Sequence, residues 1–364
     1  MSTHDPVVVA GGGAAGAAAA LALARAGRRV LLVDDSAGGF RVGEALPPWA
    51  RPLLRDLGVL DRFLADGHLP CHGNLSAWGG GEVHVTDFVR TPHGHGWHLD
   101  RARFDALLRD AARDAGAELR TGVRVRDVER AGARWRVRLG GEEVECEWLV
   151  DATGRRCSLA RRLGASLIRE DALVAFYARY RAEAPDRDTR TLVEAGPDGW
   201  WYTALLPGGE RIVAFMTDAD LAPRAELLAH DGFAVRLAES THVREILRSH
   251  GYAPSGRVRG ADAASARLDR CTGPGWAAAG DAALALDPLS SQGILNALYT
   301  GKRAGEAIHR ALSGDGGALA EYEARVAEIH RAYHHHRAAY YGDERRWQDR
   351  PFWRRRSPAA LASV

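Results

Sequence analysis

A glycine-rich stretch between two apolar segments constrains this chain most: Gly11 to Gly16 reads G-G-G-A-A-G. The run Pro6 to Ala10 before it is typical of a buried strand, and the alanine-rich run Ala14 to Ala26 after it is typical of a helix. Arg29 to Val33 predicts a second strand, which Asp34 follows. Such glycines let the backbone approach a pyrophosphate, whose charge the helix N-terminus stabilises. The sequence therefore predicts an α/β fold with a dinucleotide site, without distinguishing FAD from NAD.

Two further motifs follow predicted strands far downstream. Asp151 to Gly154 reads D-A-T-G and comes directly after the apolar run Trp148 to Val150. Gly280 and Asp281 come directly after the apolar run Gly275 to Ala279, and the chain then continues into a predicted helix. Each motif alone is compatible with an ordinary strand end. Their common position at strand ends predicts that they meet at one edge of a parallel sheet.

As a set, the three motifs resemble those of the FAD-dependent aromatic monooxygenases and halogenases of the hydroxybenzoate-hydroxylase-like fold. The resemblance implies a Rossmann-like FAD domain, in which Asp281 binds the ribityl chain and Ser291 to Ile294 passes the flavin ring. A helix N-terminus at that ring would stabilise the anionic reduced flavin. The residues expected to bind FAD are Gly11, Gly13, Ala14, Ala15, Gly16, Asp34, Arg41, Gly43, Arg101, Val125, Asp151, Thr153, Gly154, Gly280, Asp281, Ser291, Gly293 and Ile294.

A narrower resemblance rests on Arg41 to Pro48, Gly96 to Arg101, Gly199 to Tyr202 and aromatic residues of the tail from Tyr340 to Trp353. These stretches are similar to those of the flavoprotein tryptophan hydroxylases that help build quinone cofactors such as cysteine tryptophylquinone, relatives of the tryptophan halogenases. The likeness implies hydroxylation of an electron-rich ring, indole or tryptophan, through a flavin hydroperoxide formed from O2. The substrate would be a small molecule, carrier-bound or part of a peptide, and the electrons would come from NAD(P)H or a partner flavin reductase.

The candidate catalytic residues are Glu44, Ser290 and Gln292. Glu44 is expected to lie close to the flavin and to assist proton transfer, although a structural carboxylate would fit the sequence as well. The aromatic run Trp200, Trp201 and Tyr202 is expected to line the substrate pocket, because aromatic faces stack on an indole or phenol. The alternative is that alternate members of this strand fill the core.

Halogenation is the first alternative activity, and the sequence departs from it. Flavin halogenases of this kind use a lysine some thirty residues after the segment matching Arg41 to Pro48, and the only lysine here is Lys302. Tryptophan-type halogenases also carry a glutamate in their later flavin motif where this chain has Ser290, although phenol-type halogenases lack it too. A flavin-dependent dehydrogenase or reductase is the second alternative activity.

Composition and histidine spacing bear on other classes of function. A formal net charge of +2 with 26% charged residues gives no reason to expect nucleic-acid binding. The four cysteines form no CxxC pair, which suits free thiols in the cytoplasm, and no segment has the character of a membrane span. The histidines His93, His95 and His98 fit no common zinc pattern, so no metal is expected. His334 to His336 are expected on a solvated helix face.

The expected organisation is an FAD domain interrupted by a substrate domain. The FAD domain would comprise residues 1–75, 98–170 and 260–312, with a helix from Asp100 to Gly116 and a β-meander from Val123 to Val150. Residues 76–97 and 171–259 would form an antiparallel β-sheet substrate domain. Residues 313–364 would form a C-terminal helical segment, its aromatic residues packed and its arginines at the rim.

Overall fold

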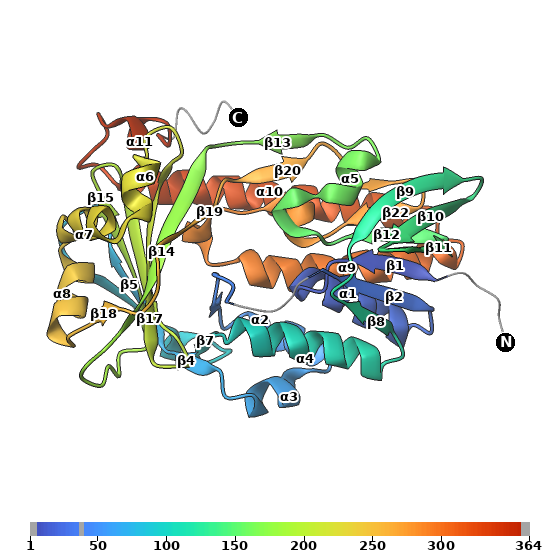
Figure 1. Cartoon of the computed structure of the whole chain (residues 1–364), viewed down its shortest axis with the longest axis horizontal. Helices are drawn as coiled ribbons and strands as arrows, with labels where there is room; N and C mark the ends of the chain where they lie inside the picture. The colour runs from blue at the N-terminus through green and yellow to red at the C-terminus, as the bar shows by residue number, and fades with distance from the viewer. Residues whose placement is uncertain (1–5, 36–39, 358–364) are drawn as a thin grey trace.

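The predicted strand–helix–strand unit forms the middle of a six-stranded sheet in the computed structural model, which describes residues 6–35 and 40–357 (Figure 1). Strand β1 (Val7–Ala10) pairs in parallel with β2 (Val30–Asp34) on one side and β12 (Trp148–Asp151) on the other. Every residue of β1 and β2 is buried, as expected of a parallel sheet covered on both faces. The full strand order is β21 (Thr272–Gly273), β22 (Trp276–Ala278), β12, β1, β2 and β8 (Glu118–Thr121).

Helix α1 (Ala14–Arg25) packs against two other helices, α4 (Arg101–Asp114) and α9 (Gly293–Leu312). The predicted N-cap of α4 is confirmed, because the Asp100 carboxylate accepts a hydrogen bond from the backbone N–H of Arg103 at 3.1 Å. Against α9, the backbones meet so closely that a Cβ atom on Gly301 would lie 2.1 Å from the carbonyl oxygen of Ala15. The alanines of α1 thus serve close helix packing.

The predicted meander is present, but its last run divides between two sheets. Strands β9 (Val125–Ala131), β10 (Arg134–Leu139) and β11 (Glu142–Cys146) form an antiparallel sheet. The single run expected to Val150 instead breaks at Glu147, and its second half is β12 of the parallel sheet. The buried apolar side chains of Leu149 and Val150 explain this change of partner, since β12 lies inside the parallel sheet.

A second large sheet faces the parallel one across the molecule (Figure 1). The four predicted segments are its strands β14 (Leu173–Arg181), β17 (Glu210–Asp218), β16 (Gly199–Leu205) and β15 (Thr191–Gly196), paired antiparallel in that order. Strand β5 (Gly73–Ala77) extends the sheet by a parallel pairing with β15. The sheet also contains β6 (His84–Asp87), β18 (Ala253–Pro254) and β19 (Arg259–Asp262). The division of the chain into domains stays a prediction.

Helices cover the outer face of this sheet, and the C-terminal segment packs on its inner face. The outer helices are α6 (Arg224–Leu228), α7 (His230–Ala238) and α8 (His242–Ser249), in the region where helical patterns were predicted. The remaining elements are α2 (Ala50–Asp56), α3 (Leu60–Ala65), α5 (Ser158–Arg162), β3 (Ala45–Leu46), β4 (Leu69–Cys71), β7 (Gly96–His98), β13 (Leu167–Arg169), β20 (Ala266–Leu268), β23 (Leu284–Ala285) and the short 3-10 turns η1 (Phe88–Arg90), η2 (Gly154–Arg156), η3 (Gly280–Ala282) and η4 (Pro288–Ser290).

The C-terminal segment consists of α10 (Ala318–Asp343) and α11 (Pro351–Arg354). Phe352 and Trp353 are buried against the inner face of the second sheet, which confirms the packing predicted for the tail aromatics. The prediction that the tail arginines lie at the rim is wrong for Arg356, which is 2% exposed and forms an ion pair with Asp218. The expectation of a solvated face is also wrong for His334, which contacts buried Glu170.

The four cysteines are buried and form no disulfide bond within the described residues, in agreement with the sequence analysis. Within residues 6–35 and 40–357, no helix combines the length and apolar character needed to cross a lipid bilayer.

Replacing Gly16 by alanine tests the packing of α1. A Cβ atom there would lie 1.8 Å from the carbonyl oxygen of Gly11, so Gly16→Ala should lower the free energy of unfolding by about 1–3 kcal/mol despite the higher helix propensity of alanine. Chemical denaturation measures this. The control Gly141→Ala, at a turn where a Cβ meets no atom within 4 Å, should change stability little. Equal stability of the two variants would contradict the packing argument.

Candidate functional site

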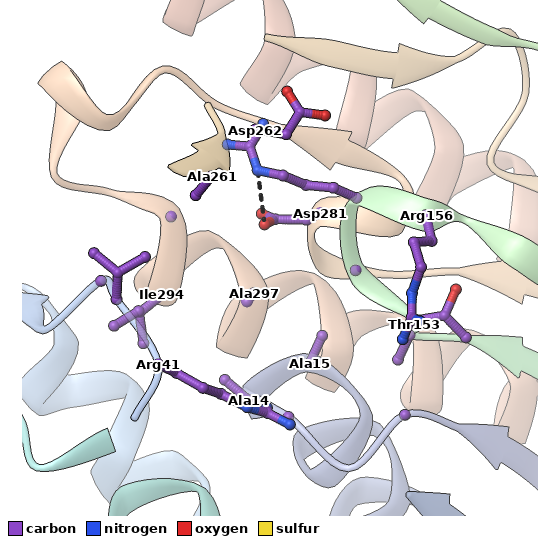
Figure 2. A pocket seen from close by; sticks show the side chains of 18 of the residues that line it. Ala14, Ala15, Arg41, Thr153, Arg156, Ala261, Asp262, Asp281, Ile294 and Ala297 are labelled. Atoms are coloured by element: carbon purple, nitrogen blue, oxygen red, sulfur yellow. Dashed lines mark ion pairs between the residues drawn. The ribbon is translucent and has the colours of Figure 1, made fainter. Parts of the chain in front are cut away.

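One cavity of about 820 Å³ lies at the carboxyl ends of β1, β2 and β12 and reaches the inner face of the second sheet. Figure 2 shows residues from both ends of the chain around it, among them Ala14, Asp281 and Ile294. Ligands of open parallel sheets bind at the carboxyl ends of the strands, and small-molecule sites span roughly 300–1,000 Å³. The cavity therefore has the position and size of a cofactor site.

The glycine-rich turn brings backbone, rather than side chains, to the cavity. Gly11 has a φ of +106°, and a Cβ atom on it would lie 2.2 Å from the carbonyl oxygen of Ala152. Gly13 faces open space, where its nearest neighbour would be an Arg41 nitrogen at 3.8 Å. Helix α1 begins here without a side-chain cap, so its first N–H groups are available to an anion. Gly16 does not line the cavity; it permits the packing described above.

Asp34 lines the cavity at the end of β2 in a fixed orientation. Its carboxylate accepts a hydrogen bond from the Gly12 N–H at 3.3 Å and forms an ion pair with Arg109 at 3.4 Å. Arg41 and Arg101 also line the cavity, together with Gly43 and Val125. The Nε atom of Arg101 is buried and has no hydrogen-bond partner in the described part of the chain. Two cations and one fixed acid thus face the space beyond α1.

Asp151 and Gly280 hold the cavity wall without lining it. The Asp151 carboxylate accepts hydrogen bonds from the backbone N–H groups of Thr153, Leu159 and Ala160 at 2.7–2.9 Å, so it has no free oxygen for a ligand. The turn that it fixes places Thr153 and Gly154 in the lining. The Gly280 N–H donates to the Thr300 hydroxyl at 2.9 Å. Both predicted binding residues therefore act by positioning their neighbours.

Asp281 does face the cavity, as Figure 2 shows. Burial raises the pKa of its carboxyl group, while Arg155, whose Nε lies 3.7 Å away, opposes that effect. Arg155 was not predicted as a site residue. It directly follows the D-A-T-G motif, and only the fold shows that this position meets Asp281.

The loop before α9 brings some of its predicted residues to the cavity and not others. Ser291, with a φ of +51°, and then Gly293 and Ile294 line it. Helix α9 begins here without a side-chain cap, giving a second helix N-terminus at the site. The catalytic candidates Ser290 and Gln292 do not line the cavity: the Ser290 hydroxyl donates to the Asp287 carbonyl at 2.9 Å, and Gln292 is exposed. Ser290 therefore contacts the lining residue Asp287, but neither predicted catalytic side chain faces the cavity.

Glu44 is a buried carboxyl group at the cavity, 2% exposed. It accepts hydrogen bonds from the Tyr202 hydroxyl at 2.5 Å and from the Gly43 N–H at 3.0 Å. Burial raises its pKa, against the effect of these hydrogen bonds and of Arg101. Burial and the Glu44 charge likewise raise the pKa of Tyr202 well above its usual range. The pair can hold a proton at the cavity wall.

The three aromatic residues of β16 have different surroundings because side chains alternate across a strand. Tyr202 lines the cavity. Trp201 points to the outer face and packs against Phe215 and Phe233 at ring distances of 4.8 and 5.5 Å. Trp200 lies on the inner face, yet outside the lining, and donates a hydrogen bond to the Tyr341 hydroxyl at 3.1 Å. Of the three, the structure brings Tyr202 alone to the cavity.

Small side chains of the second sheet widen the cavity beside Tyr202. Ala175, Ala214 and Ala261 line it, together with Met216. Ala175 lies opposite Met216 on β17 and Ala261 on β19, and Ala214 lies two residues from Met216 on the same face of β17, so these side chains form one continuous wall. They were not predicted from the sequence, since alanine in a strand carries no signal of its own. The wall leaves room for a flat ring beside the part of the cavity that the glycine-rich turn lines.

The residues present fit FAD. A cradle at Gly11 and Gly13, two uncapped helix N-termini and an unpartnered Arg101 nitrogen suit an anionic dinucleotide, and the alanine wall suits an aromatic ring system. Residues 4–337 match the FAD binding domain family. The chain belongs to this family. It is an enzyme of the flavin oxidoreductase class, within the superfamily of flavin-dependent monooxygenases and halogenases.

The individual relatives and solved structures carry several different named activities. The chain is 31% identical to LodB of Marinomonas mediterranea, named as an FAD-dependent oxidoreductase, over 98% of this chain and 97% of LodB. It resembles the flavin-dependent halogenase CmlS with a TM-score of 0.87 and 26% identity, covering 98% of this chain and 68% of CmlS. It resembles the peptidyl tryptophan dihydroxylase QhpG with a TM-score of 0.81 and 29% identity, covering 98% of this chain and 79% of QhpG.

The pH dependence of stability tests the burial of Glu44. Because the folded state raises its pKa above the ordinary 4.5, the stability contributed by protonated Glu44 is present below that pH and is lost as the pH rises through the folded pKa. Glu44→Gln removes this loss. At saturating FAD, the free energy of unfolding of Glu44→Gln minus that of the wild type should therefore increase as the pH rises above about 4.5.

Glu245→Gln is the matched control, because Arg248 lowers the pKa of that exposed carboxyl group. Its difference from the wild type should be small and of opposite sign. A Glu44→Gln difference that does not vary with pH would contradict the raised pKa.

Proposed function

We propose that this enzyme hydroxylates an electron-rich aromatic ring, with indole or tryptophan, free or in a peptide, as its substrate class. The observation that carries the proposal is the absence of a lysine from the cavity lining. The sole lysine of the sequence, Lys302, lies on α9 outside that lining and pairs with Glu306 at 2.6 Å. The resemblance to flavin halogenases implies a lysine that delivers the halogen, and this chain has none to supply at the cavity.

The place where that lysine is expected is β5 and the residue after it. Trp78 ends this stretch and is 9% exposed. Its ring packs against Trp200, Tyr341 and Trp353 at centroid distances of 5.2–6.4 Å, and its indole N–H donates to the carbonyl of Tyr340. An aromatic core thus occupies the region in which a halogenase would hold a cation.

The chain's own groups suit aromatic hydroxylation at the cavity. Bound FAD, once reduced, would supply the activation of O2. Ala175, Ala214 and Met216 form an apolar wall that can orient a flat ring and exclude water. Glu44 and Tyr202 can hold or donate a proton at their shared hydrogen bond. The likeness to QhpG, named for action on peptidyl tryptophan, supports the substrate class.

Two other activities have specific support. Halogenation is favoured by the TM-score of 0.87 to CmlS over 98% of the chain. A reductase is favoured by 31% identity to a menaquinone reductase of Mycobacterium tuberculosis over 78% of the chain. We propose either NAD(P)H or a partner flavin reductase as the electron source of the hydroxylase.

Product masses distinguish the three activities. The purified protein is supplied with chemically reduced FAD, air, chloride and bromide, and a panel of indoles, phenols, tryptophan-containing peptides and a menaquinone. Hydroxylation predicts a product heavier by one or more oxygen atoms, with O2 consumed. A halogenated product would overturn the lysine argument, and turnover of a quinone without O2 consumption would assign a reductase.

Substituting Glu44 tests its part in catalysis. Glu44→Ala should lower turnover by about 100-fold or more while FAD stays bound, because general acid–base groups contribute roughly 10²–10⁴. Tyr202→Phe, which keeps the ring and removes the hydroxyl, should lower turnover less. Glu321→Ala, at an exposed site on α10, is the control for expression and flavin content. Unchanged turnover in Glu44→Ala would leave Glu44 with a structural role only.

A further inference from the structure

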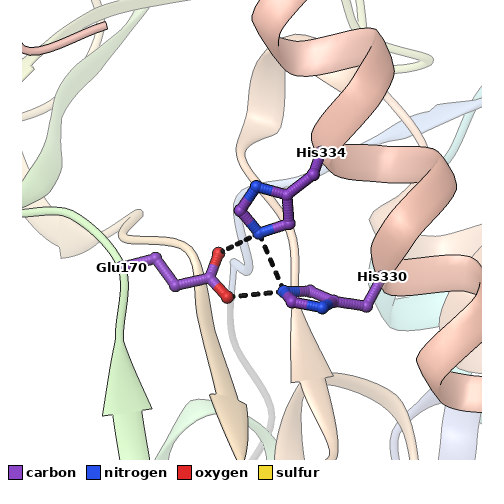
Figure 3. Close-up of side chains that lie close together, drawn as sticks. All are labelled: Glu170, His330 and His334. Atoms are coloured by element: carbon purple, nitrogen blue, oxygen red, sulfur yellow. Dashed lines mark hydrogen bonds and ion pairs between the residues drawn. The ribbon is translucent and has the colours of Figure 1, made fainter. Parts of the chain in front are cut away.

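Three side chains from distant parts of the sequence meet beside helix α10, away from the flavin cavity. Glu170 follows β13, and His330 and His334 lie one turn apart on α10 (Figure 3). The Nε2 atom of His330 lies 2.5 Å from one Glu170 oxygen and 2.8 Å from Nε2 of His334, which lies 3.0 Å from the other Glu170 oxygen. Two imidazole nitrogens and a carboxylate thus converge on one point.

No placement of protons satisfies this triangle while Glu170 is ionised. If both histidines carry a proton on Nε2, each can donate to Glu170, but the two N–H groups then face each other at 2.8 Å. If only one carries a proton there, one nitrogen lone pair is left facing a carboxylate oxygen. The Glu170 oxygen nearest His334 is buried and accepts no hydrogen bond within the described residues. A single cation that accepts all three lone pairs removes the conflict.

We propose that Glu170, His330 and His334 bind a divalent transition-metal ion of the zinc class. Two imidazole nitrogens and one carboxylate oxygen are a common zinc ligand set, at about 2.0–2.2 Å from the ion. Atoms so bound are separated by about 3.3 Å, so the three atom pairs need to move apart by roughly 0.3 to 0.8 Å. His330 and His334 keep 20% and 19% of their side chains exposed, which leaves a side open for a water ligand.

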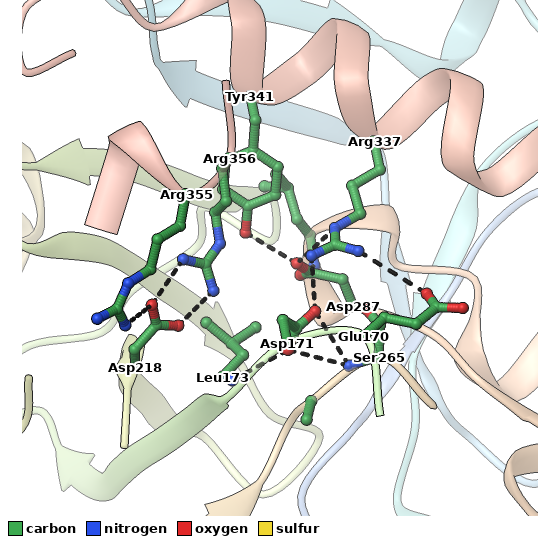
Figure 4. Close-up of polar contacts among 12 residues, drawn as sticks. Glu170, Asp171, Leu173, Asp218, Ser265, Asp287, Arg337, Tyr341, Arg355 and Arg356 are labelled. Carbon is green, nitrogen blue, oxygen red and sulfur yellow. Dashed lines mark hydrogen bonds and ion pairs between the residues drawn. The ribbon is translucent and has the colours of Figure 1, made fainter. Parts of the chain in front are cut away.

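The surrounding charges leave room for a cation. Arg267 and Arg337 lie 3.6 and 3.9 Å from Glu170 and hold its carboxylate in place. Arg337 is also paired with Asp171 at 2.6 Å and lies 3.9 Å from Asp287 (Figure 4). Arg356 also acts on Asp171 and Asp287, but it is paired with Asp218. Four carboxylates therefore face three guanidinium groups before the histidines are counted. The resulting negative balance favours a bound cation over a pair of neutral imidazoles.

The ion would link α10 to the loop between β13 and β14, which contains Glu170. Asp287 links this region to the flavin cavity, because Tyr333 and Arg337 on the same stretch of α10 both contact it. The Tyr333 hydroxyl accepts a hydrogen bond from the Asp287 N–H at 3.1 Å, and the Arg337 guanidinium lies 3.9 Å from the Asp287 carboxylate. Asp287 itself lines the cavity. A metal here would thus stabilise the loop before α9 without touching FAD, and the inference does not depend on the reaction proposed above.

The experiment measures zinc in the FAD-loaded, tag-free full chain. We expect about one zinc ion per chain after exposure to micromolar zinc and gel filtration, and imidazole scattering with no sulfur ligand in its X-ray absorption spectrum. His334→Ala and Glu170→Gln should weaken binding by more than about 100-fold, beyond the effect usual for groups that only orient a ligand. The matched controls His335→Ala and His336→Ala, exposed on the same helix, should bind zinc like the wild type.

A measurement on the wild type alone covers the case in which a variant fails to fold. Removing the ion with a chelator should lower the thermal midpoint at constant flavin absorbance, and zinc should restore it. Absence of zinc uptake by the wild type, or equal loss in the His335→Ala and His336→Ala controls, would overturn the proposal. So would a sulfur ligand in the absorption spectrum.

Discussion

The structure depends on how closely helix α1 can approach its neighbours. At Gly16 and Gly301 the main chains are in direct contact, and any side chain at either position would collide with a carbonyl oxygen. This closeness places the start of α1 and the start of α9 at the same cavity, one from each end of the chain. Each helix N-terminus can then act on a different part of one bound cofactor, since its partial positive charge falls off within a turn. The small residues of α1 therefore matter because they allow the site to form, rather than because they stabilise the helix.

The structure also depends on buried charged groups beneath the C-terminal segment. Asp287 accepts a hydrogen bond from the Tyr341 hydroxyl at 2.8 Å (Figure 4). The Tyr341 hydroxyl in turn accepts one from the Trp200 indole N–H. Burial raises the pKa of Asp287, and Arg337 opposes that effect. Buried polar groups of this kind are costly unless every partner is present. The cavity wall at Asp287 is thus coupled to side chains that never reach the cavity.

The sequence predicted the parts of the site that are local in the chain. Strand, glycine turn, helix and Asp34 follow one another, so periodicity and glycine spacing were enough to place them. The prediction that Trp201 lines the pocket had no such basis, because which face of β16 meets the cavity is decided by partner strands. Asp151 was predicted to bind the cofactor because of its motif, yet its oxygens are used by the turn itself. Glu170 meets α10 only through tertiary packing, which no spacing reveals.

The packing of the tail on the second sheet has a kinetic consequence. Trp200 meets Tyr341 across 141 residues of sequence, and Trp353 donates to Gly196 across 157. Pairings of such long separation form slowly, since a large loop must close before they contribute. During synthesis, α10 and α11 are the last elements to leave the ribosome. Until then the inner face of the second sheet, including Trp78 and Trp200, is not covered. An intermediate with this aromatic surface exposed is prone to aggregate until the last two helices cover it.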